Sequence, residues 1–225
     1  MLGREKPVHI YAHQGLEKVV DVQLQVSNAR LNFEIKYHLL NDVSGEVLVE
    51  NKHFRVETIR LEHGIPCSGF LIREVKKPRN ITKSAIEKYH IPIDVRNQIK
   101  MGEDLKMADG TVIKNEELTS DPPKIRSYAY CSDTAYSEDI VETINGVDLL
   151  YHEATFMEDK RERAKETYHS TAAQAAEIAK KAGVGKLLLG HFSARYKEMD
   201  LFLSEASAIF EHVTLAEDGT EYSIA

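Results

Sequence analysis

Histidine and carboxylate side chains follow three strands that the sequence predicts, at the point where each strand ends. Asp133 closes the stretch "RSYAYCSD", Glu153 follows His152 at the end of "GVDLLYHE", and His191 follows "KLLLG". The carboxyl ends of parallel strands meet at one edge of an open sheet, where such folds bind ligands. We therefore expect these side chains to lie close together.

Two further histidines extend this predicted rim. His63 stands where the strand "VETIRL" gives way to the loop "EHGIPC", and His169 stands just before a predicted helix. Imidazole and carboxylate ligands together suit zinc or manganese, and a carboxylate can bridge two ions. Each residue has a structural alternative, because Asp133 could cap a turn and Glu153 could orient a histidine or pair with a lysine. The same chemistry at four strand ends favours a metal site.

The elements that must position these residues alternate between strands and helices. Gln174 lies three residues after Thr171, which predicts a capping box at the start of a helix that Gly183 ends. Asp218-Gly219 indicates a final hairpin. The expected strands are 8–12, 33–40, 46–50, 54–61, 68–75, 126–134, 146–155 and 186–191, and the expected helices begin near Gln14, His169 and Met199.

Composition limits the class of protein. The chain has 225 residues, of which 42% are hydrophobic, and this suffices for one large domain or two small ones. A formal charge of −7 argues against an extended nucleic-acid footprint, though not against a local basic patch. The two cysteines are far apart, which fits a reducing cytoplasm. No apolar run reaches membrane-spanning length, so we expect no membrane partner.

Residues 76–124 differ in character from the rest of the chain. They carry many charges of both signs and little continuous apolar pattern, and "ADG" between "LKM" and "TVI" predicts a hairpin turn. We interpret the segment as an excursion inserted into the core domain. The residues alone favour a surface loop region over an arm that grips a partner.

The stretches "LEHGIPCSGF", "YCSDTAY", "LLYHEATF", "YHSTAAQAAEIAKKAG" and "LLLGHFSARY" resemble, in this order, those of ribonuclease Z. This family consists of tRNA 3′-processing endonucleases with the metallo-β-lactamase fold. The resemblance implies an α/β fold, an αββα sandwich formed by residues 1–225. It also implies that residues 77–124 are the family's flexible arm, the exosite that holds tRNA.

The resemblance implies zinc ligands among these residues. His63 and His191 resemble ligands, and Asp133 resembles the carboxylate that bridges two zinc ions. Manganese in place of zinc stays open.

The resemblance also implies a catalytic pair. His169 resembles the residue that donates a proton to the leaving oxygen or steadies the phosphate, and Glu153 would orient it. Arg195 would hold a phosphate through its fork of donors.

The implied activity is zinc-dependent hydrolysis that removes the 3′ trailer from precursor tRNA. The family acts as homodimers, in which the arm of one subunit presents tRNA to the site of the other. In a chain this acidic, the arm's basic residues must be gathered locally, namely Lys76, Lys77, Arg79, Lys83 and Lys88.

Two features depart from the family pattern. The arm reads "HIPIDVRNQIKMG" where many relatives carry a Gly-Pro signature. The family's His-x-His-x-Asp-His signature, which supplies further ligands and a general base, does not occur in the sequence. We therefore expect an N-terminally truncated chain that starts at an engineered, mis-annotated or internal Met1.

Two alternatives to a tRNA endonuclease remain open. One is another hydrolase of the same fold, such as a thioesterase or a small-molecule phosphodiesterase, for which the long arm would have no use. The other is an inactive remnant that binds RNA or dimerises.

Overall fold

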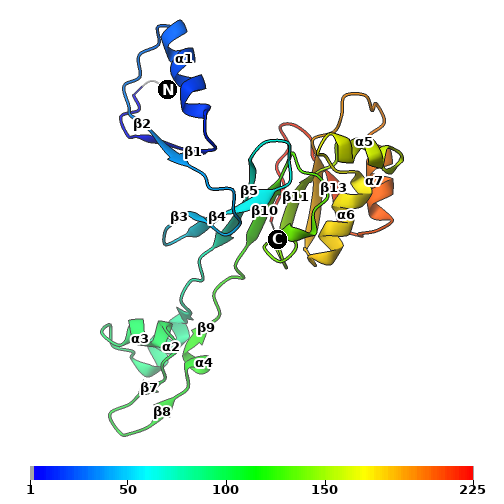
Figure 1. Ribbon diagram of the computed structural model, residues 1–225. Coiled ribbons are helices and arrows are strands. Elements are labelled where there is room, and N and C mark those ends of the chain that lie inside the picture. The colour runs from blue at the N-terminus through cyan, green and yellow to red at the C-terminus, as the bar shows by residue number, and fades with distance from the viewer. Residues whose placement is uncertain (1–2, 225) are drawn as a thin grey trace. The chain divides into compact units, whose positions relative to one another are not determined.

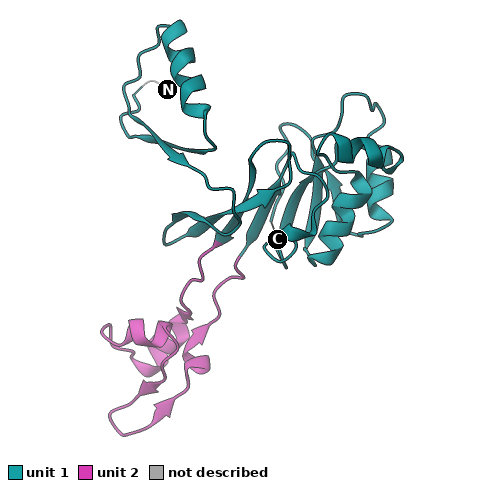
Figure 2. Cartoon of the chain, in the orientation of Figure 1, with its two compact units in different colours: residues 1–73, 126–225 teal, residues 74–125 magenta. Residues whose placement is uncertain are grey.

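The protein is described from a computed structural model, which covers residues 3–224 and separates into two compact units (Figure 2). Unit 1 consists of the residues up to Arg73 and from Arg126 onward. Unit 2 is the continuous segment Glu74–Ile125. The metal-site candidates all belong to unit 1.

Unit 1 contains a two-stranded sheet, a seven-stranded sheet and several helices, most of which are labelled in Figure 1. Among residues 3–224, no helix is long and apolar enough to cross a bilayer. In chain order the elements are β1 (Val8–Ala12), α1 (Leu16–Val26), β2 (Ile35–Leu39), β3 (Val47–Glu50), β4 (Phe54–Leu61), β5 (Cys67–Glu74), β10 (Ser127–Cys131), η1 (Glu138–Ile140), β11 (Leu149–Glu153), η2 (Glu158–Lys160), α5 (Arg161–Glu166), α6 (Ala172–Lys181), β12 (Lys186–Gly190), α7 (Asp200–Ser207) and β13 (Val213–Leu215).

The large sheet is mixed, with strand order β13-β12-β11-β10-β5-β4-β3. Strands β10 to β13 run parallel, while β5 is antiparallel to β10. In the register, Cys131 lies opposite His152, which lies opposite Leu189. The carboxyl ends of β10, β11 and β12 therefore meet at one edge of the sheet, as the sequence predicted.

Helices α6 and α7 pack on one face of this sheet and form the main core with it. Leu150, Leu187 and Leu189 are fully buried against the alanine-rich face of α6 and against Phe202 of α7. The predicted capping box is confirmed: Thr171 Oγ1 accepts from Gln174 N at 3.2 Å, and Gln174 Oε1 accepts from Thr171 N at 3.0 Å. This start of α6 fixes the backbone directly after His169.

Gly190, the last residue of β12, has no room for a side chain. A Cβ at this position would collide with the ring of Tyr151 on β11, which itself stacks on Tyr130 at a centroid distance of 4.7 Å. The absence of a side chain at Gly190 therefore allows the end of β12 to lie close to β11 before the chain turns at His191.

We expect Gly190→Ala to lower the free energy of unfolding by about 1–3 kcal/mol, because the added methyl overpacks the strand pair. Chemical denaturation measures this value. In a protein that already carries Tyr151→Ala, Gly190→Ala should lower the free energy of unfolding clearly less, because the ring that the methyl would meet is absent. Equal costs in both backgrounds would contradict this explanation.

The predicted C-terminal hairpin is wrong. β13 pairs in parallel with β12, and no strand returns alongside it among the described residues up to 224. The turn does form, with Gly219 at φ +80°. Beyond it, the Tyr222 hydroxyl donates to Leu215 O at 3.0 Å and accepts from Glu217 N at 2.9 Å. The Tyr222 side chain thus forms hydrogen bonds with backbone groups that would otherwise pair with a returning strand.

Unit 2 has a small core of its own, made of five buried apolar residues: Ala85, Ile91, Ile99, Leu105 and Leu118. The predicted hairpin around Asp109-Gly110 is confirmed, since β7 (Leu105–Lys106) and β8 (Val112–Ile113) pair antiparallel across it. That residues 77–124 act as a tRNA-binding arm stays a prediction. The elements are β6 (Asn80–Ile81), α2 (Lys83–Tyr89), α3 (Arg96–Lys100), β7 (Leu105–Lys106), β8 (Val112–Ile113), α4 (Asn115–Leu118) and β9 (Thr119–Ser120).

Candidate metal centre

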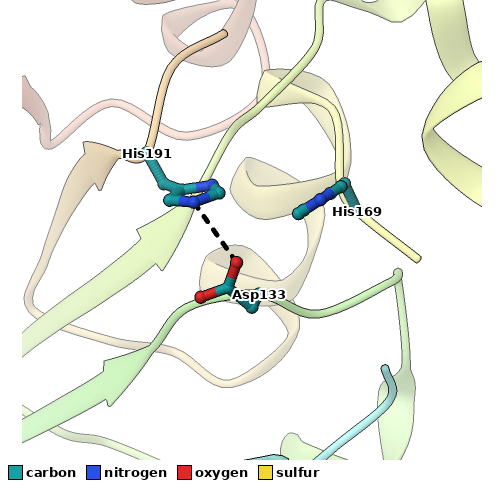
Figure 3. A group of neighbouring side chains, drawn as sticks. All are labelled: Asp133, His169 and His191. Carbon is teal, nitrogen blue, oxygen red and sulfur yellow. Dashed lines mark ion pairs between the residues drawn. The ribbon is translucent and has the colours of Figure 1, made fainter. Parts of the chain in front are cut away.

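Three of the predicted site residues converge at the carboxyl edge of the sheet (Figure 3). Asp133, His169 and His191 each offer one potential ligand atom, and these atoms all lie within 4.8 Å of one another. The Nε2 atom of His191 lies 3.2 Å from Oδ1 of Asp133. The side chains come from the ends of β10 and β12 and from the turn before α6.

The backbone at these positions adopts a conformation that is uncommon for residues with a side chain. Asp133 has φ +55° and His191 has φ +58°, and Tyr168, directly before His169, has φ +57°. Residues other than glycine in this left-handed region are uncommon, and when they occur they cluster at functional sites. The chain thus reverses sharply at each of the three points that supply the cluster.

His63 lies beside this cluster, in the turn between β4 and β5. Its ring centroid is 5.5 Å from that of His169, and its Nδ1 lies 3.1 Å from the carbonyl oxygen of Tyr168. Because a carbonyl only accepts, Nδ1 is the donor in this contact, which turns Nε2 away from it. The structure therefore places His63 near the other candidates, though outside the group whose atoms lie within 4.8 Å.

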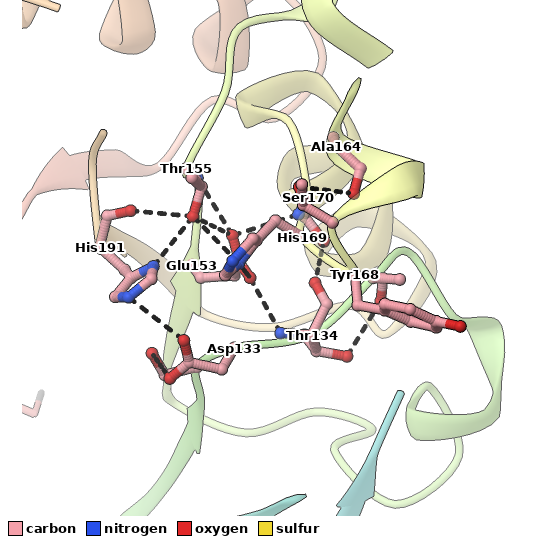
Figure 4. Close-up of polar contacts among 12 residues, drawn as sticks. Asp133, Thr134, Glu153, Thr155, Ala164, Tyr168, His169, Ser170 and His191 are labelled. Atoms are coloured by element: carbon pink, nitrogen blue, oxygen red, sulfur yellow. Dashed lines mark hydrogen bonds and ion pairs between the residues drawn. The ribbon is translucent and has the colours of Figure 1, made fainter. Parts of the chain in front are cut away.

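Glu153, at the end of β11, is fully buried and accepts five hydrogen bonds (Figure 4). Its Oε1 accepts from Thr134 N at 2.9 Å and from His169 Nδ1 at 2.7 Å. Its Oε2 accepts from Thr155 N at 3.1 Å and Thr155 Oγ1 at 2.7 Å, and from Ser170 N at 3.1 Å. Every lone-pair direction of the carboxylate is therefore used inside the protein.

These contacts shift the pKa values of both partners. Burial raises the pKa of Glu153, but hydrogen bonds from His169 and Thr155 outweigh it, so the pKa lies below its ordinary value. The hydrogen bond to Glu153 raises the pKa of His169, against the opposing effect of burial. Glu153 is out of contact with solvent, and its direct side-chain contact in the cluster is with His169.

Two other residues of the predicted site lie apart from the cluster. The exposed guanidinium of Arg195 stacks over the ring of Phe156 at 4.9 Å, and that ring centroid is 6.3 Å from the ring of His169. His152 is fully buried, with Nδ1 2.8 Å from the backbone oxygen of Glu153, and burial lowers its pKa. His152 therefore belongs to the core and is no ligand candidate.

The donor set of the cluster fits a divalent metal. An imidazole nitrogen and a carboxylate oxygen 3.2 Å apart attract each other only when a cation, either a metal ion or a proton, lies between them. His169 donates a hydrogen bond from Nδ1 to Glu153, so Nε2 is the ring atom that remains available to a metal or to a substrate. Two imidazoles and one carboxylate are the ligand types of a His/Asp metal site.

Sequence reasoning missed Thr155, whose hydroxyl contacts Glu153, His169 and His191 (Figure 4). A signal was present: Thr155 lies two residues after Glu153, and such residues share one side of an extended segment. The roles of Thr134 and Ser170 could not be read from their types, because both donate to Glu153 through backbone N–H groups.

Comparisons with known proteins are consistent with this geometry. The beta-lactamase superfamily domain model matches residues 122–192. The chain is 46% identical over 220 residues to ribonuclease Z of Bacteroides fragilis, covering 97% of this chain and 72% of the relative. It is 40% identical over 226 residues to ribonuclease Z of Cytophaga hutchinsonii, covering 100% of this chain and 72% of the relative. The crystal structure of the short form of human tRNase Z matches with a TM-score of 0.62 at 23% identity, covering all of this chain and 70% of that one. This structural likeness shows the metallo-β-lactamase fold.

Proposed function

The chain belongs to the ribonuclease Z family, and from that premise we propose that it is a metal-dependent endoribonuclease that removes the 3′ trailer from precursor tRNA by phosphodiester hydrolysis. The observation that carries the proposal is the convergence of Asp133, His169 and His191 at one sheet edge. A chain of this family needs a metal site at that edge, and the cluster has the ligand types for one.

We propose zinc as the metal. His63, Asp133 and His191 would hold it, with Asp133 as the carboxylate that the family resemblance assigns to both ions, while His169 beside them has another role. Support comes from the ligand types, since nitrogen and carboxylate oxygen are preferred by zinc. Bound zinc supplies Lewis-acid chemistry: it neutralises charge on a phosphodiester and makes water a nucleophile near neutral pH.

His169 is proposed as the general acid. Its Nδ1 is committed to Glu153, so Nε2 is the atom that would give a proton to the departing ribose oxygen. The raised pKa of His169 supports this role, because a general acid must hold its proton near neutral pH. Arg195, exposed and braced on Phe156, is proposed to bind a phosphate of the substrate.

Unit 2 is proposed to hold the tRNA body. A hollow of about 510 Å³ within this unit is lined by four cationic side chains and by Pro78, Met101, Asp121 and Pro122. RNA phosphates bind to cationic side chains. Because the whole chain has a net charge of −7, binding of RNA requires a local basic patch such as this one. The cationic residues are Lys76, Lys77, Arg79 and Lys100.

We further propose, from family membership, that the protein is a cytoplasmic homodimer. Both cysteines are free thiols, and burial raises the pKa of Cys67 and raises that of Cys131 to about 12. Thiols that stay protonated resist oxidation, which suits a reducing compartment but does not require one. Equilibrium sedimentation of the purified chain tests the dimer, and a monomer at micromolar concentration would contradict it.

The function is tested with a precursor tRNA that carries a 3′ trailer, in the presence of zinc. We expect cleavage that yields a separate trailer. The double variant Lys76→Glu/Lys77→Glu should weaken tRNA binding at least about 10-fold, because two phosphate contacts are lost. The same variant should leave hydrolysis of a small phosphodiester unchanged.

The matched control is Lys180→Glu, which reverses an exposed charge outside unit 2. Equal tRNA binding by the double variant and the control would contradict the role of unit 2. Hydrolysis of the small phosphodiester without cleavage of precursor tRNA would favour a small-molecule phosphodiesterase. Binding of tRNA without any hydrolysis would favour an inactive remnant.

A further inference from the structure

A second hollow, of about 560 Å³, lies beside the metal centre, and we call it the side pocket. Three of the residues that line it are close sequence neighbours of candidate site residues: Glu62 precedes His63, Ala135 follows Asp133 by two positions, and Tyr168 precedes His169. The backbone N–H of Ala135 donates to Glu62 O at 2.8 Å, which joins two of these segments. The side pocket and the metal centre are therefore built from the same three segments of the chain.

Tyr168 gives the side pocket an exposed aromatic ring. The residue is 43% exposed, and its ring centroid lies 6.3 Å from that of His63, with the two rings edge to face. In Figure 4 its hydroxyl end points away from Asp133 and His191. The backbone φ of +57° is unfavourable for a bulky residue and would suit glycine or asparagine better. The turn itself therefore does not call for a tyrosine, and strain of this kind is typical of functional sites.

A second tyrosine adds to the aromatic part of the lining. Tyr136 also lines the side pocket, and its hydroxyl accepts from Lys181 Nζ at 2.8 Å and donates to Glu138 Oε1 at 2.9 Å. Because the hydroxyl is engaged in these bonds, Tyr136 offers a ligand the apolar surface of its ring rather than a hydrogen bond.

The charged residues of the lining argue against a phosphate as the ligand. They are three carboxylates and one amine: Glu62, Glu162, Glu166 and Lys165. Arg60 pairs with Glu62 at 3.9 Å and Arg163 pairs with Glu166 at 3.1 Å, which partly balances the negative charge. Carboxylates repel a phosphate, whereas an uncharged aromatic ligand with N–H donors would meet tyrosine rings and carboxylate acceptors. A nucleobase is a ligand of this kind.

We propose that the side pocket binds an unpaired nucleobase that flanks the scissile phosphate, stacked on the ring of Tyr168. This inference rests on the proposed function, because it takes the ligand from the RNA that would be cleaved. The 6.3 Å between the rings of Tyr168 and His63 is a separation that a single nucleotide can span. Stacking on an aromatic side chain accepts every base, since each has a π face. The pocket would thereby fix which phosphodiester of the strand lies at the metal centre.

The first test uses precursor tRNA that carries 2-aminopurine, a fluorescent adenine analogue whose emission falls when it stacks. The analogue replaces either the last nucleotide of the tRNA body or the first nucleotide of the trailer, and zinc-free protein is used so that the RNA stays intact. We expect the unsubstituted protein and Tyr168→Phe to quench the analogue in at least one of these positions. The quenched position shows on which side of the phosphate the pocket binds its base.

Tyr168→Asn is the decisive variant, because it removes the ring and suits the left-handed backbone, and it should not quench the analogue. It should also weaken binding of precursor tRNA about 10-fold, which is the size of effect expected for one stacked base. With an abasic nucleotide at the quenched position, Tyr168→Asn and the unsubstituted protein should bind equally, because the ring then has no partner. The matched control is Phe54→Asn, which removes an exposed ring at the opposite end of β4 from His63 and should quench fully.

The outcomes separate this inference from the proposed function. Bound tRNA without quenching at either position would overturn the inference, and so would equal quenching by Tyr168→Asn. An equal loss of affinity for intact and abasic tRNA would also overturn it, because the ring would then act through the fold. If quenching depends on Tyr168 but the chain cleaves nothing after zinc is added, the inference stands and the endonuclease proposal fails. A chain that binds no tRNA would contradict both.

Discussion

Asp133→Ala is expected to weaken zinc binding at least about 100-fold and to leave no zinc on the protein after dialysis. Asp133 supplies the one negative charge among the three side chains that converge at the sheet edge. Without it, the proposed site offers only imidazole ligands, which carry no negative charge to balance that of a divalent ion. If Asp133 bridges two ions, as proposed, both should be lost together.

The measurement is zinc per chain by elemental analysis, with affinity from indicator competition. The backbone at position 133 has φ +55°, a conformation that is less favourable for alanine than for aspartate or asparagine. The Asp133→Ala variant is therefore also expected to be somewhat less stable. Asp133→Asn separates the two effects, because it removes the charge and tolerates the same backbone. Asp139→Ala, an exposed carboxylate in η1, is the matched control and should keep all its zinc. Full zinc content in Asp133→Asn would exclude Asp133 as a ligand.

The sheet edge could be predicted from sequence because each part of the argument was local. "KLLLG" is a short apolar run bounded by glycines, and the capping residues Thr171 and Gln174 fix the start of α6. Since β10, β11 and β12 are parallel neighbours, their ends had to meet. The order of apolar runs and turn residues was therefore enough to predict that Asp133 and His191 lie together.

The same reasoning could not tell which side chains of a strand end face the site. His152 and Glu153 are adjacent in sequence, yet His152 lies in the core while Glu153 reaches His169. Thr155 was missed because a hydroxyl has no preferred chemistry until its neighbours are known. The prediction of a C-terminal hairpin failed for a similar reason, since two hydrogen bonds of the Tyr222 hydroxyl stand where a strand pairing was expected.

The largest stability effect is expected at Glu153. Glu153→Gln should lower the free energy of unfolding by about 3–5 kcal/mol, because the new amide group would replace a fully buried carboxylate and would face N–H donors. On one side these donors are Thr134 N and His169 Nδ1, and on the other Thr155 N and Ser170 N. Whichever way the amide turns, one pair of donors loses its acceptor. Glu142→Gln, an exposed change, should stay within about 0.5 kcal/mol of the unsubstituted protein.

The size of this loss should depend on pH. The pKa of Glu153 is lowered on folding, so the stability it contributes is present above its ordinary value of 4.5 and is lost as pH falls through the folded value. The pKa of His169 is raised on folding, so its contribution is complete below its ordinary value of 6.5 and is lost as pH rises through the folded value. The difference in unfolding free energy between the unsubstituted protein and Glu153→Gln should therefore be greatest between pH 4.5 and pH 6.5. Above pH 6.5 this difference in unfolding free energy should become smaller as His169 loses its charge. It should not vanish there, because the Glu153 carboxylate keeps its hydrogen bonds to uncharged N–H and O–H donors. Urea unfolding of zinc-free protein at about pH 3.5, 5.5 and 8.5 measures it, and a difference below about 1 kcal/mol at pH 5.5 would mean that the Glu153–His169 pair does not stabilise the fold.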